Sequence, residues 1–151
     1  MVLTLGAAAG VIAAEAAVRS RVNRAPAETY PRRLSNRLEL RRAHNHGLVG
    51  SRFEDRPKVV YAYQTAANLA AVSGAVLANL AWPCSGLTRL GVGLVTGGAL
   101  SNYVERLRHG SVTDYLHGVD LPVDLLNHRI WNLADMAIFN GAVLAAVGLV
   151  L

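Results

Sequence analysis

The sequence predicts an all-α membrane protein, namely a bundle of four transmembrane helices with a small extramembrane β-sheet element. Two observations support this fold class. Hydrophobic residues make up 52% of the 151 residues, and the mean hydropathy is +0.29. They are gathered into blocks, and the longest block, residues 59–82, contains no charged side chain. An uncharged stretch of that length is long enough to cross the hydrocarbon of a bilayer.

The first block predicts a helix over about residues 2–18. A secretory signal peptide is the alternative, because Ala14-Glu15-Ala16 loosely resembles a cleavage site. Such peptides carry Lys or Arg before the apolar run, and this block does not, so we favour a first span. Glu15 and Arg19 are four residues apart and share a helix face. We expect them to form a structural ion pair near the end of this span.

Residues 19–58 are polar and hold 11 of the 15 basic residues. Apolar and charged residues alternate from Arg37 to Arg42, which is the period of a half-exposed strand. Asn45-His46-Gly47 follows and is typical of a turn. The sequence therefore predicts a small β element around residues 34–53.

The second and third predicted spans, residues 59–82 and about 86–104, are joined by a short turn and so form an antiparallel hairpin. Asn68 and Asn79 are expected to face other helices, since an amide exposed to lipid is costly. Small residues at Gly93 and Gly97 allow close helix approach in the third span. Trp82 is typical of a membrane interface. With a fourth span at 133–151, we predict one integral-membrane domain over residues 1–151.

Two carboxylates, Asp114 and Asp135, lie beside the third and fourth spans, an arrangement that indicates aspartyl hydrolysis at a bilayer surface. Asn102, Glu105 and Arg106 fall at positions i, i+3 and i+4, on one face at the end of the third span. Residues 116–131 are predicted to form a loop long enough to cover the pair of carboxylates. The acids within that loop, at positions 120 and 124, are interpreted as solvated.

Three blocks in this order resemble the lipoprotein signal peptidase (signal peptidase II) family. The family pattern consists of a glycine pair followed by Asn and an acid–Arg step, then V-x-D-[F/Y], then [aromatic]-N-x-A-D. In this chain the blocks are Gly97-Gly98 with Asn102 and Glu105-Arg106, then Val112-x-Asp114-Tyr115, then Trp131-Asn132-x-Ala134-Asp135. Glu105 stands where the family usually has Asp, so we interpret it as structural.

The resemblance implies an intramembrane aspartic endopeptidase with Asp114 and Asp135 as the catalytic residues. It implies that Asn45, Asn102, Arg106 and Asn132 bind substrate or support the site. The substrate would be a diacylglyceryl-modified prolipoprotein, cut before the lipidated cysteine, and globomycin-like inhibitors would bind. The location would be the bacterial cytoplasmic (inner) membrane, in contact with lipid, with the active site on the extracytoplasmic face. No cofactor is expected.

The distribution of basic residues and histidines bears on three further questions, namely nucleic-acid binding, metal binding and membrane topology. The sequence pI is about 10.0, but no basic stripe is interleaved with aromatic residues, so nucleic acid is not an expected partner. The five histidines lack metal-site spacing, and no metal site is predicted. With four spans, 14 of the 15 basic residues lie on the side of the two aspartates, and the positive-inside rule would place that side in the cytoplasm. This conflicts with the family's topology, which we follow because its linked motifs are more specific.

Two other functions stay open at the level of sequence. One is a divergent, non-catalytic relative that binds lipidated segments or a membrane partner, which the change at Glu105 would suit. The other is a small proton-coupled transporter whose acids relay protons within the membrane. Transporters usually show paired repeats and more spans than this chain, so the transporter is the least favoured of the three.

Overall fold

Four long helices and a small sheet make up the described part of the chain. The structure is a computed structural model, and it describes residues 1–48, 51–80, 84–122 and 127–151. The helices are α1 (Val2–Arg24), α2 (Pro57–Leu80), α3 (Gly86–His109) and α5 (Leu133–Val150), with a short 3₁₀ helix, η1, at Ala27–Thr29. The strands are β1 (Arg32–Ser35), β2 (Leu38–Asn45), β3 (Val112–Gly118) and β4 (Ile130–Trp131). The fold is thus mostly helical with a small antiparallel sheet.

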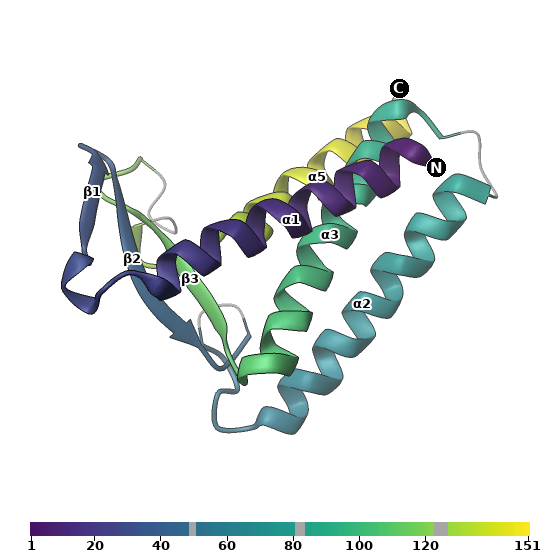
Figure 1. Ribbon diagram of the computed structural model, residues 1–151. Coiled ribbons are helices and arrows are strands. Elements are labelled where there is room, and N and C mark those ends of the chain that lie inside the picture. Colours follow the sequence, from purple (N-terminus) through teal and green to yellow (C-terminus); the bar gives the residue numbers. More distant parts are fainter. Residues whose placement is uncertain (49–50, 81–83, 123–126) are drawn as a thin grey trace.

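Helix α3 lies at the centre of the bundle because glycines on its two sides let α1 and α5 approach closely (Figure 1). A Cβ added to Gly97 would lie 2.6 Å from the carbonyl oxygen of Ala8 in α1, and one added to Gly98 would lie 2.5 Å from that of Ala134 in α5. Both distances are far below a normal carbon–oxygen contact. The two adjacent glycines therefore bring the backbones of α1 and α5 close to two different faces of α3.

Helix α2 packs less closely than the other three. It runs beside α3 and diverges from it toward the C-terminal end of α2 (Figure 1). Only Val60 and Asn68 are buried among its described side chains. At its far end Asn79 exchanges a hydrogen bond with Thr4 of α1, at 3.0 Å from the Asn79 amide to the Thr4 hydroxyl. Asn79 thus faces another helix, as expected. The predicted interfacial residue Trp82 lies outside the described residues.

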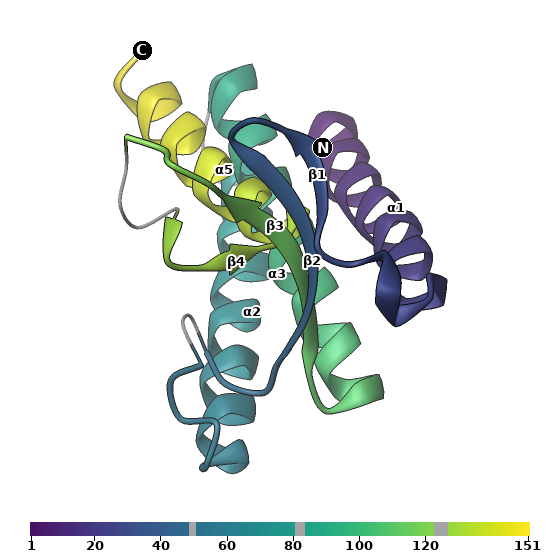
Figure 2. The same cartoon turned by 90° about the vertical axis from the view of Figure 1, so that its left-hand side faces the viewer.

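The sheet crosses one end of the helix bundle, where α1 and α3 end and α5 begins (Figure 2). Its strand order is β1-β2-β3-β4, and all neighbouring strands are antiparallel. The sheet is held to α1 by Arg42 of β2, which donates to the carbonyl of Ala25 at the end of that helix at 2.9 Å. Such terminal carbonyls have no partner within their own helix, so an arginine is well suited to bind them.

Two sequence predictions about this region need correction. The sheet is larger than the predicted element around residues 34–53, because β3 and β4 belong to it. Part of the predicted loop at residues 116–131 is therefore strand: Leu116 pairs with Trp131 and His117 with Ile130. Asp114 consequently lies on a strand and not at a helix end. Asp120 is exposed, as expected, while the acid at position 124 lies outside the described residues.

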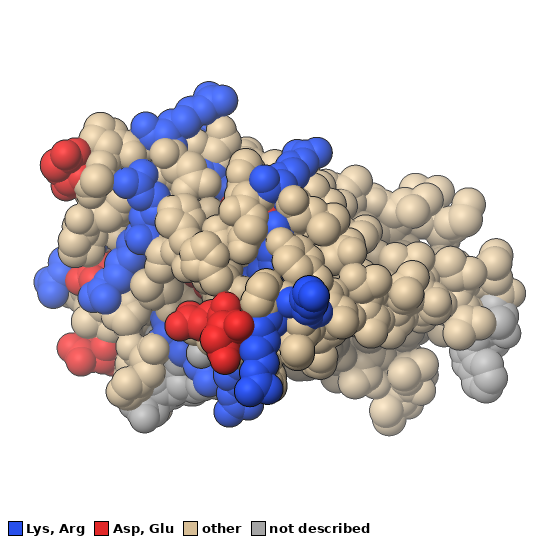
Figure 3. All heavy atoms as spheres, turned by 90° about the horizontal axis from the view of Figure 1, so that it is seen from below, with Lys and Arg blue, Asp and Glu red and all other residues tan. Residues whose placement is uncertain are grey.

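Apolar and charged surfaces are separated along the molecule. Within the described residues, α1 and α5 are long and apolar enough to cross a membrane. Large apolar side chains of the helices are exposed, such as Leu5 in α1, Leu69 in α2 and Phe139 in α5. Seen from below, Lys and Arg gather over the part of the molecule that contains the sheet, and the far ends of the helices are almost uncharged (Figure 3). This distribution suits a protein with one end outside the bilayer.

Candidate active site

Asp114 is placed by a sharp turn between α3 and β3. Gly110 ends α3 in the left-handed conformation with φ of 73°, donating its N–H to the carbonyl of Arg106. A glycine at this position has no Cβ to clash, which is why it commonly ends helices. Strand β3 begins two residues later, and Asp114 lies opposite Ala43 of β2. The turn thus directs β3 back across the end of α3 and buries the Asp114 carboxylate.

Asp135 is placed by the first turn of α5. Asn132 caps this helix: its side-chain oxygen accepts from the N–H of Asp135 at 2.8 Å, and the Asp135 carboxylate accepts from the N–H of Asn132 at 3.3 Å. This reciprocal arrangement is a capping box, which satisfies two N–H groups that have no partner inside the helix. The cap fixes the Asp135 side chain against the start of α5.

Three asparagine amides join the two carboxylates. Asn132 donates to Asp114 at 2.7 Å, and Asn45 donates to the second oxygen of Asp114 at 3.2 Å. Asn102 donates to Asp135 at 2.9 Å. The Asn132 amide also donates to the side-chain oxygen of Asn102 at 3.3 Å. These five residues, Asn45, Asn102, Asp114, Asn132 and Asp135, are called the aspartate cluster below.

The environment of Asp114 favours its protonated form. Burial raises the pKa of Asp114 to about 7, and the negative charge of nearby Asp135 acts in the same direction. The amide donors Asn132 and Asn45 oppose this rise by stabilising the carboxylate. Near neutral pH this carboxyl therefore both gives up and accepts a proton readily, which is what acid–base catalysis requires.

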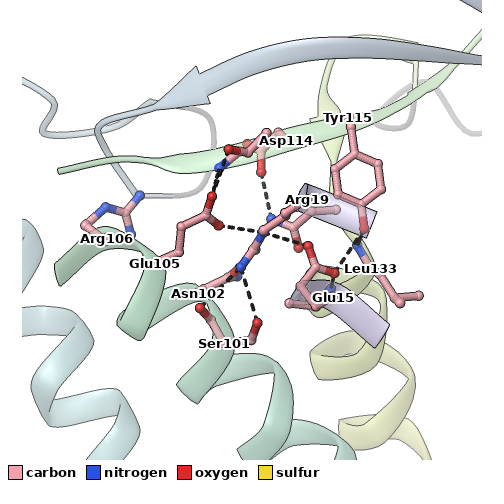
Figure 4. A network of polar contacts seen from close by, with 12 residues as sticks. Glu15, Arg19, Ser101, Asn102, Glu105, Arg106, Asp114, Tyr115 and Leu133 are labelled. Atoms are coloured by element: carbon pink, nitrogen blue, oxygen red, sulfur yellow. Dashed lines mark hydrogen bonds and ion pairs between the residues drawn. The ribbon is translucent and has the colours of Figure 1, made fainter. Parts of the chain in front are cut away.

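A second polar cluster lies next to the aspartate cluster and contains a cation as well as carboxylates (Figure 4). Arg19 of α1 forms ion pairs with Glu15, at 2.7 Å, and with Glu105 of α3, at 2.5 Å. All three side chains are buried. The carboxylate of Glu105 also accepts from the hydroxyl of Thr113 in β3 at 2.8 Å. We call Glu15, Arg19 and Glu105 the ion cluster.

Glu15 connects the ion cluster to both elements that carry an aspartate. It accepts from the hydroxyl of Tyr115, the neighbour of Asp114, at 3.0 Å, and from the N–H of Ala134, the neighbour of Asp135, at 2.9 Å. The Tyr115 hydroxyl in turn accepts from the N–H of Leu133 at 3.1 Å. Burial raises the pKa of Tyr115, so it remains a hydrogen-bond donor to Glu15 at neutral pH.

Arg106 holds the end of β2 against α3. Its guanidinium donates to the backbone carbonyls of Asn45, at 2.9 Å, and Gly47, at 2.6 Å. The family resemblance implies that Arg106 binds substrate or supports the site, and the carbonyls that it contacts in the structure belong to the chain itself. Arg106 thereby supports the strand end from which Asn45 reaches Asp114.

The arrangement suits hydrolysis by a pair of carboxylates. One buried and one half-buried aspartate are connected through neutral amides, and two such groups in proximity can share one proton. Among the described residues, no group of three or more His, Cys, Asp or Glu side chains is arranged to hold a metal ion.

Comparison with known proteins places the chain in a family. The family model described as signal peptidase (SPase) II matches residues 7–151. The chain belongs to the signal peptidase II family.

Individual family members share shorter stretches with this chain. A lipoprotein signal peptidase of Nitrobacter hamburgensis is 38% identical over 79 residues, covering 50% of this chain and 48% of that protein. One of Rhodopseudomonas palustris is 37% identical over 73 residues, covering 46% and 44%. The matched stretches thus span about half of the length of these relatives. One of Lactiplantibacillus plantarum is 29% identical over 113 residues, covering 74% of this chain and 68% of that protein.

Solved structures share the fold at low sequence identity. A bacterial membrane enzyme determined by the in meso method at 2.3 Å resolution aligns with a TM-score of 0.80 and 18% identity, over 97% of this chain and 87% of that one. A second, at 1.9 Å resolution, aligns with a TM-score of 0.72 over 97% and 91%. The four helices and the sheet of this signal peptidase II family member therefore occur together in bacterial membrane enzymes.

The structure brings together most of the residues that the sequence singled out in this signal peptidase II family member. Asn45, which lies 69 positions before Asp114, contacts it directly. The Glu15–Arg19 ion pair forms as the helical spacing predicts. Sequence reasoning assigned no role to Tyr115, which it quoted only as part of a motif, and did not single out Thr113; the hydroxyls of both contact the ion cluster. Their position beside Asp114 could have indicated them. Successive residues of a strand point to opposite faces, so Thr113 and Tyr115 share the face that Asp114 does not occupy.

Proposed function

We propose that this chain is an aspartic endopeptidase that removes signal peptides from diacylglyceryl-modified prolipoproteins, cutting before the lipidated cysteine. Membership of the signal peptidase II family supports the substrate class. The observation that carries the proposal is the connection of Asp114 to Asp135 through the amides of Asn132 and Asn102. Two carboxyls held in this way supply an acid and a base without a cofactor.

The proposed reaction uses the two aspartates in turn. The ionised aspartate takes a proton from a water molecule, which attacks the scissile carbonyl. The protonated aspartate donates its proton to the carbonyl oxygen, which gives a gem-diol intermediate. When the C–N bond breaks, the aspartate that was protonated by the water gives that proton to the leaving amine, and the other aspartate takes a proton back from the gem-diol as the carbonyl forms again. The raised pKa of Asp114 makes it a suitable carrier of the shared proton near neutral pH. Throughout the proposed reaction, the two carboxyls are held in a fixed relative orientation by the amides of Asn45, Asn102 and Asn132.

The proposed placement in the membrane has four spans, with the aspartates at the extracytoplasmic face of the bacterial cytoplasmic (inner) membrane. Exposed apolar side chains on α1, α2 and α5 are compatible with lipid contact, and in this placement the end with the charged sheet would lie outside the bilayer. The acyl chains of the substrate would then remain in the bilayer. The peptide segment next to the lipidated cysteine would reach the aspartate cluster from the side, through the plane of the membrane. The sole cysteine, Cys84, lies near the opposite end, between α2 and α3, and offers a test of this topology.

The topology test labels intact cells with a membrane-impermeant maleimide. Native Cys84 should remain unlabelled until the cells are permeabilised, whereas a Cys84→Ser, Ser35→Cys variant should be labelled from outside. The reverse pattern would place the aspartates in the cytoplasm, as the distribution of basic residues alone suggests.

The activity test compares cleavage of a diacylglyceryl-modified prolipoprotein by the wild type, Asp114→Asn and Asp135→Asn. Each aspartate variant should lose at least about a thousandfold in rate, since loss of one member disables the shared-proton pair. Asp55→Asn is the matched control, because Asp55 is a solvent-exposed acid. Globomycin should inhibit the wild type. A well-folded wild type that leaves several such substrates intact would point to a non-catalytic relative.

A further inference from the structure

Arg19 makes contacts in three directions with a single guanidinium (Figure 4). Its Nε lies between the carboxylates of Glu15 and Glu105. One terminal nitrogen donates to both the carbonyl and the hydroxyl of Ser101, at 3.2 Å each. The other donates to the side-chain oxygen of Asn102 at 2.5 Å. This last contact joins the ion cluster directly to the aspartate cluster.

We infer that Arg19 is a positioning residue that fixes the orientation of the Asn102 amide and, through it, the hydrogen bond received by Asp135. The inference rests on the proposed peptidase function for its meaning in catalysis. It depends on two bonds of Asn102, one to Arg19 through its oxygen and one to Asp135 through its nitrogen; the same oxygen also accepts from the Asn132 amide at 3.3 Å.

An asparagine amide needs such a fixed partner because its two ends have nearly the same shape and opposite hydrogen-bonding character. If the Asn102 amide turned over, its oxygen would face the Asp135 carboxylate and its NH₂ group would face the guanidinium of Arg19. Both new contacts would be repulsive. A guanidinium has only donors, so its presence beside Asn102 excludes the turned orientation and leaves the NH₂ group directed at Asp135.

The guanidinium is itself held in place from two helices. Glu15 of α1 and Glu105 of α3 pair with it on one side, and Ser101 of α3 accepts on the other. A lysine at this position would keep the charge, but its three donors radiate from one atom, and Arg and Lys are not interchangeable at forked sites. Lysine could pair with the two carboxylates but would not reach Asn102 at the same time.

A double-mutant cycle tests whether Arg19 acts through Asn102. Arg19→Lys retains the cation between the glutamates, so the fold should persist while kcat falls about tenfold or more and KM changes less than about threefold. In an Asn102→Ala background the same Arg19→Lys change should alter kcat by less than about threefold. Thr4→Val is the matched control, because it removes a buried polar contact of α1 with Asn79, far from the aspartates. Its kcat should equal that of the wild type. If the Arg19→Lys and Asn102→Ala effects multiply, the inference is overturned.

A second measurement does not depend on catalysis. In protein labelled with ¹⁵N-asparagine and kept in detergent micelles, Arg19→Lys should shift the side-chain amide signals of Asn102 and Asn132 and leave that of Asn79 in place. Thr4→Val should do the opposite. If the wild type cleaves no prolipoprotein, the proposed function fails, and these spectra alone decide the inference. Unchanged Asn102 signals in Arg19→Lys would overturn it.

Discussion

The two buried polar clusters of this protein provide partners for buried carboxyl groups in different ways. In the aspartate cluster, the hydrogen-bond donors to Asp114 and Asp135 within the described residues are neutral amides or backbone N–H groups. In the ion cluster, Glu15 and Glu105 are paired with the cation Arg19. Both clusters bury carboxyl groups at the same end of the bundle, and both join residues from distant parts of the chain.

The difference explains which carboxyls are suited to chemistry. A cation in direct contact stabilises the charged form of a carboxyl and commits it to a structural role. Neutral amides stabilise a carboxylate in part but bring no opposite charge, so burial can leave the carboxyl able to bind a proton near neutral pH. Asp114, with a pKa raised to about 7, is the clearest example. The separation of the two clusters therefore allows a rigid support to lie beside a titrating pair.

Removal of the cation should produce the largest effect on stability. Arg19→Leu leaves Glu15 and Glu105 buried without a counter-charge, and breaking a buried pair in this way costs about 3–5 kcal/mol. We expect a large loss of folded protein in detergent and a strongly lowered midpoint of thermal unfolding. The measurement is the folded yield from size-exclusion chromatography together with that midpoint.

A neutral version of the ion cluster sharpens this prediction. Combining Arg19→Leu with Glu15→Gln and Glu105→Gln removes the charges together, and neutral replacements of buried ion pairs are often tolerated. Most of the folded yield should return in this triple variant. If the triple variant is as unstable as Arg19→Leu alone, the instability comes from lost packing and not from uncompensated charge.

Loss of the central amide should mainly affect activity. Asn132→Leu removes the donor to Asp114 and the cap of α5, and removal of one well-placed donor costs about a hundredfold or more in kcat. The lost cap should lower stability by about 1 kcal/mol. Asn140→Leu is the control on the same helix, since the Asn140 amide is exposed and bonds only to the backbone of its own helix in the described contacts. Equal losses in both variants would contradict a special role for Asn132.

Local sequence spacing predicted the contacts that lie within one helix. The separation of four residues correctly indicated the Glu15–Arg19 pair, and the apolar blocks indicated where the helices lie. Helix α1 extends to Arg24, beyond the expected end near residue 18, because charged residues at the end of a helix can continue it outside the apolar environment. Such limits are set by solvent and packing, which hydropathy alone does not specify.

The resemblance to a family, and not spacing, supplied the long-range members of the site. Asn45 and Asp114 are 69 positions apart, and Glu15 lies 119 positions from Ala134, with which it bonds. These residues come into contact only when β2 pairs with β3 and α1 packs against α3 at the centre of the bundle. The strand at Val112–Gly118 was not predicted, and its last three residues were assigned to the loop at residues 116–131, although the register of this strand with β2 determines where Asp114 lies.

The raised pKa of Asp114 predicts a dependence of stability on pH. The folded protein holds this proton more tightly than the unfolded chain, whose carboxyl titrates near 3.8. Between about pH 4 and pH 7 the unfolded state therefore loses a proton that the folded state keeps, so the free energy of unfolding falls as the pH rises. Asp114→Asn removes this term, and its thermal midpoint in detergent should decline less steeply across that window than the wild type's. Parallel curves for the two proteins would contradict the raised pKa.

The smallest effect is expected where one carboxylate of the ion cluster is shortened. Glu105→Asp restores the residue that the family pattern usually carries, but the shorter side chain cannot keep both Arg19 and Thr113 at their present distances of 2.5 and 2.8 Å. Since Glu15 still pairs with Arg19, we expect a loss of about 1 kcal/mol, or about 2–4 °C in the thermal midpoint. The value of kcat/KM should stay within about threefold. Glu39→Asp, which shortens an acid in a more exposed pair with Arg41, controls for the lost methylene. If Glu105→Asp reduced cleavage as strongly as Asn132→Leu, the two clusters would act as one unit, and the division between support and chemistry would be wrong.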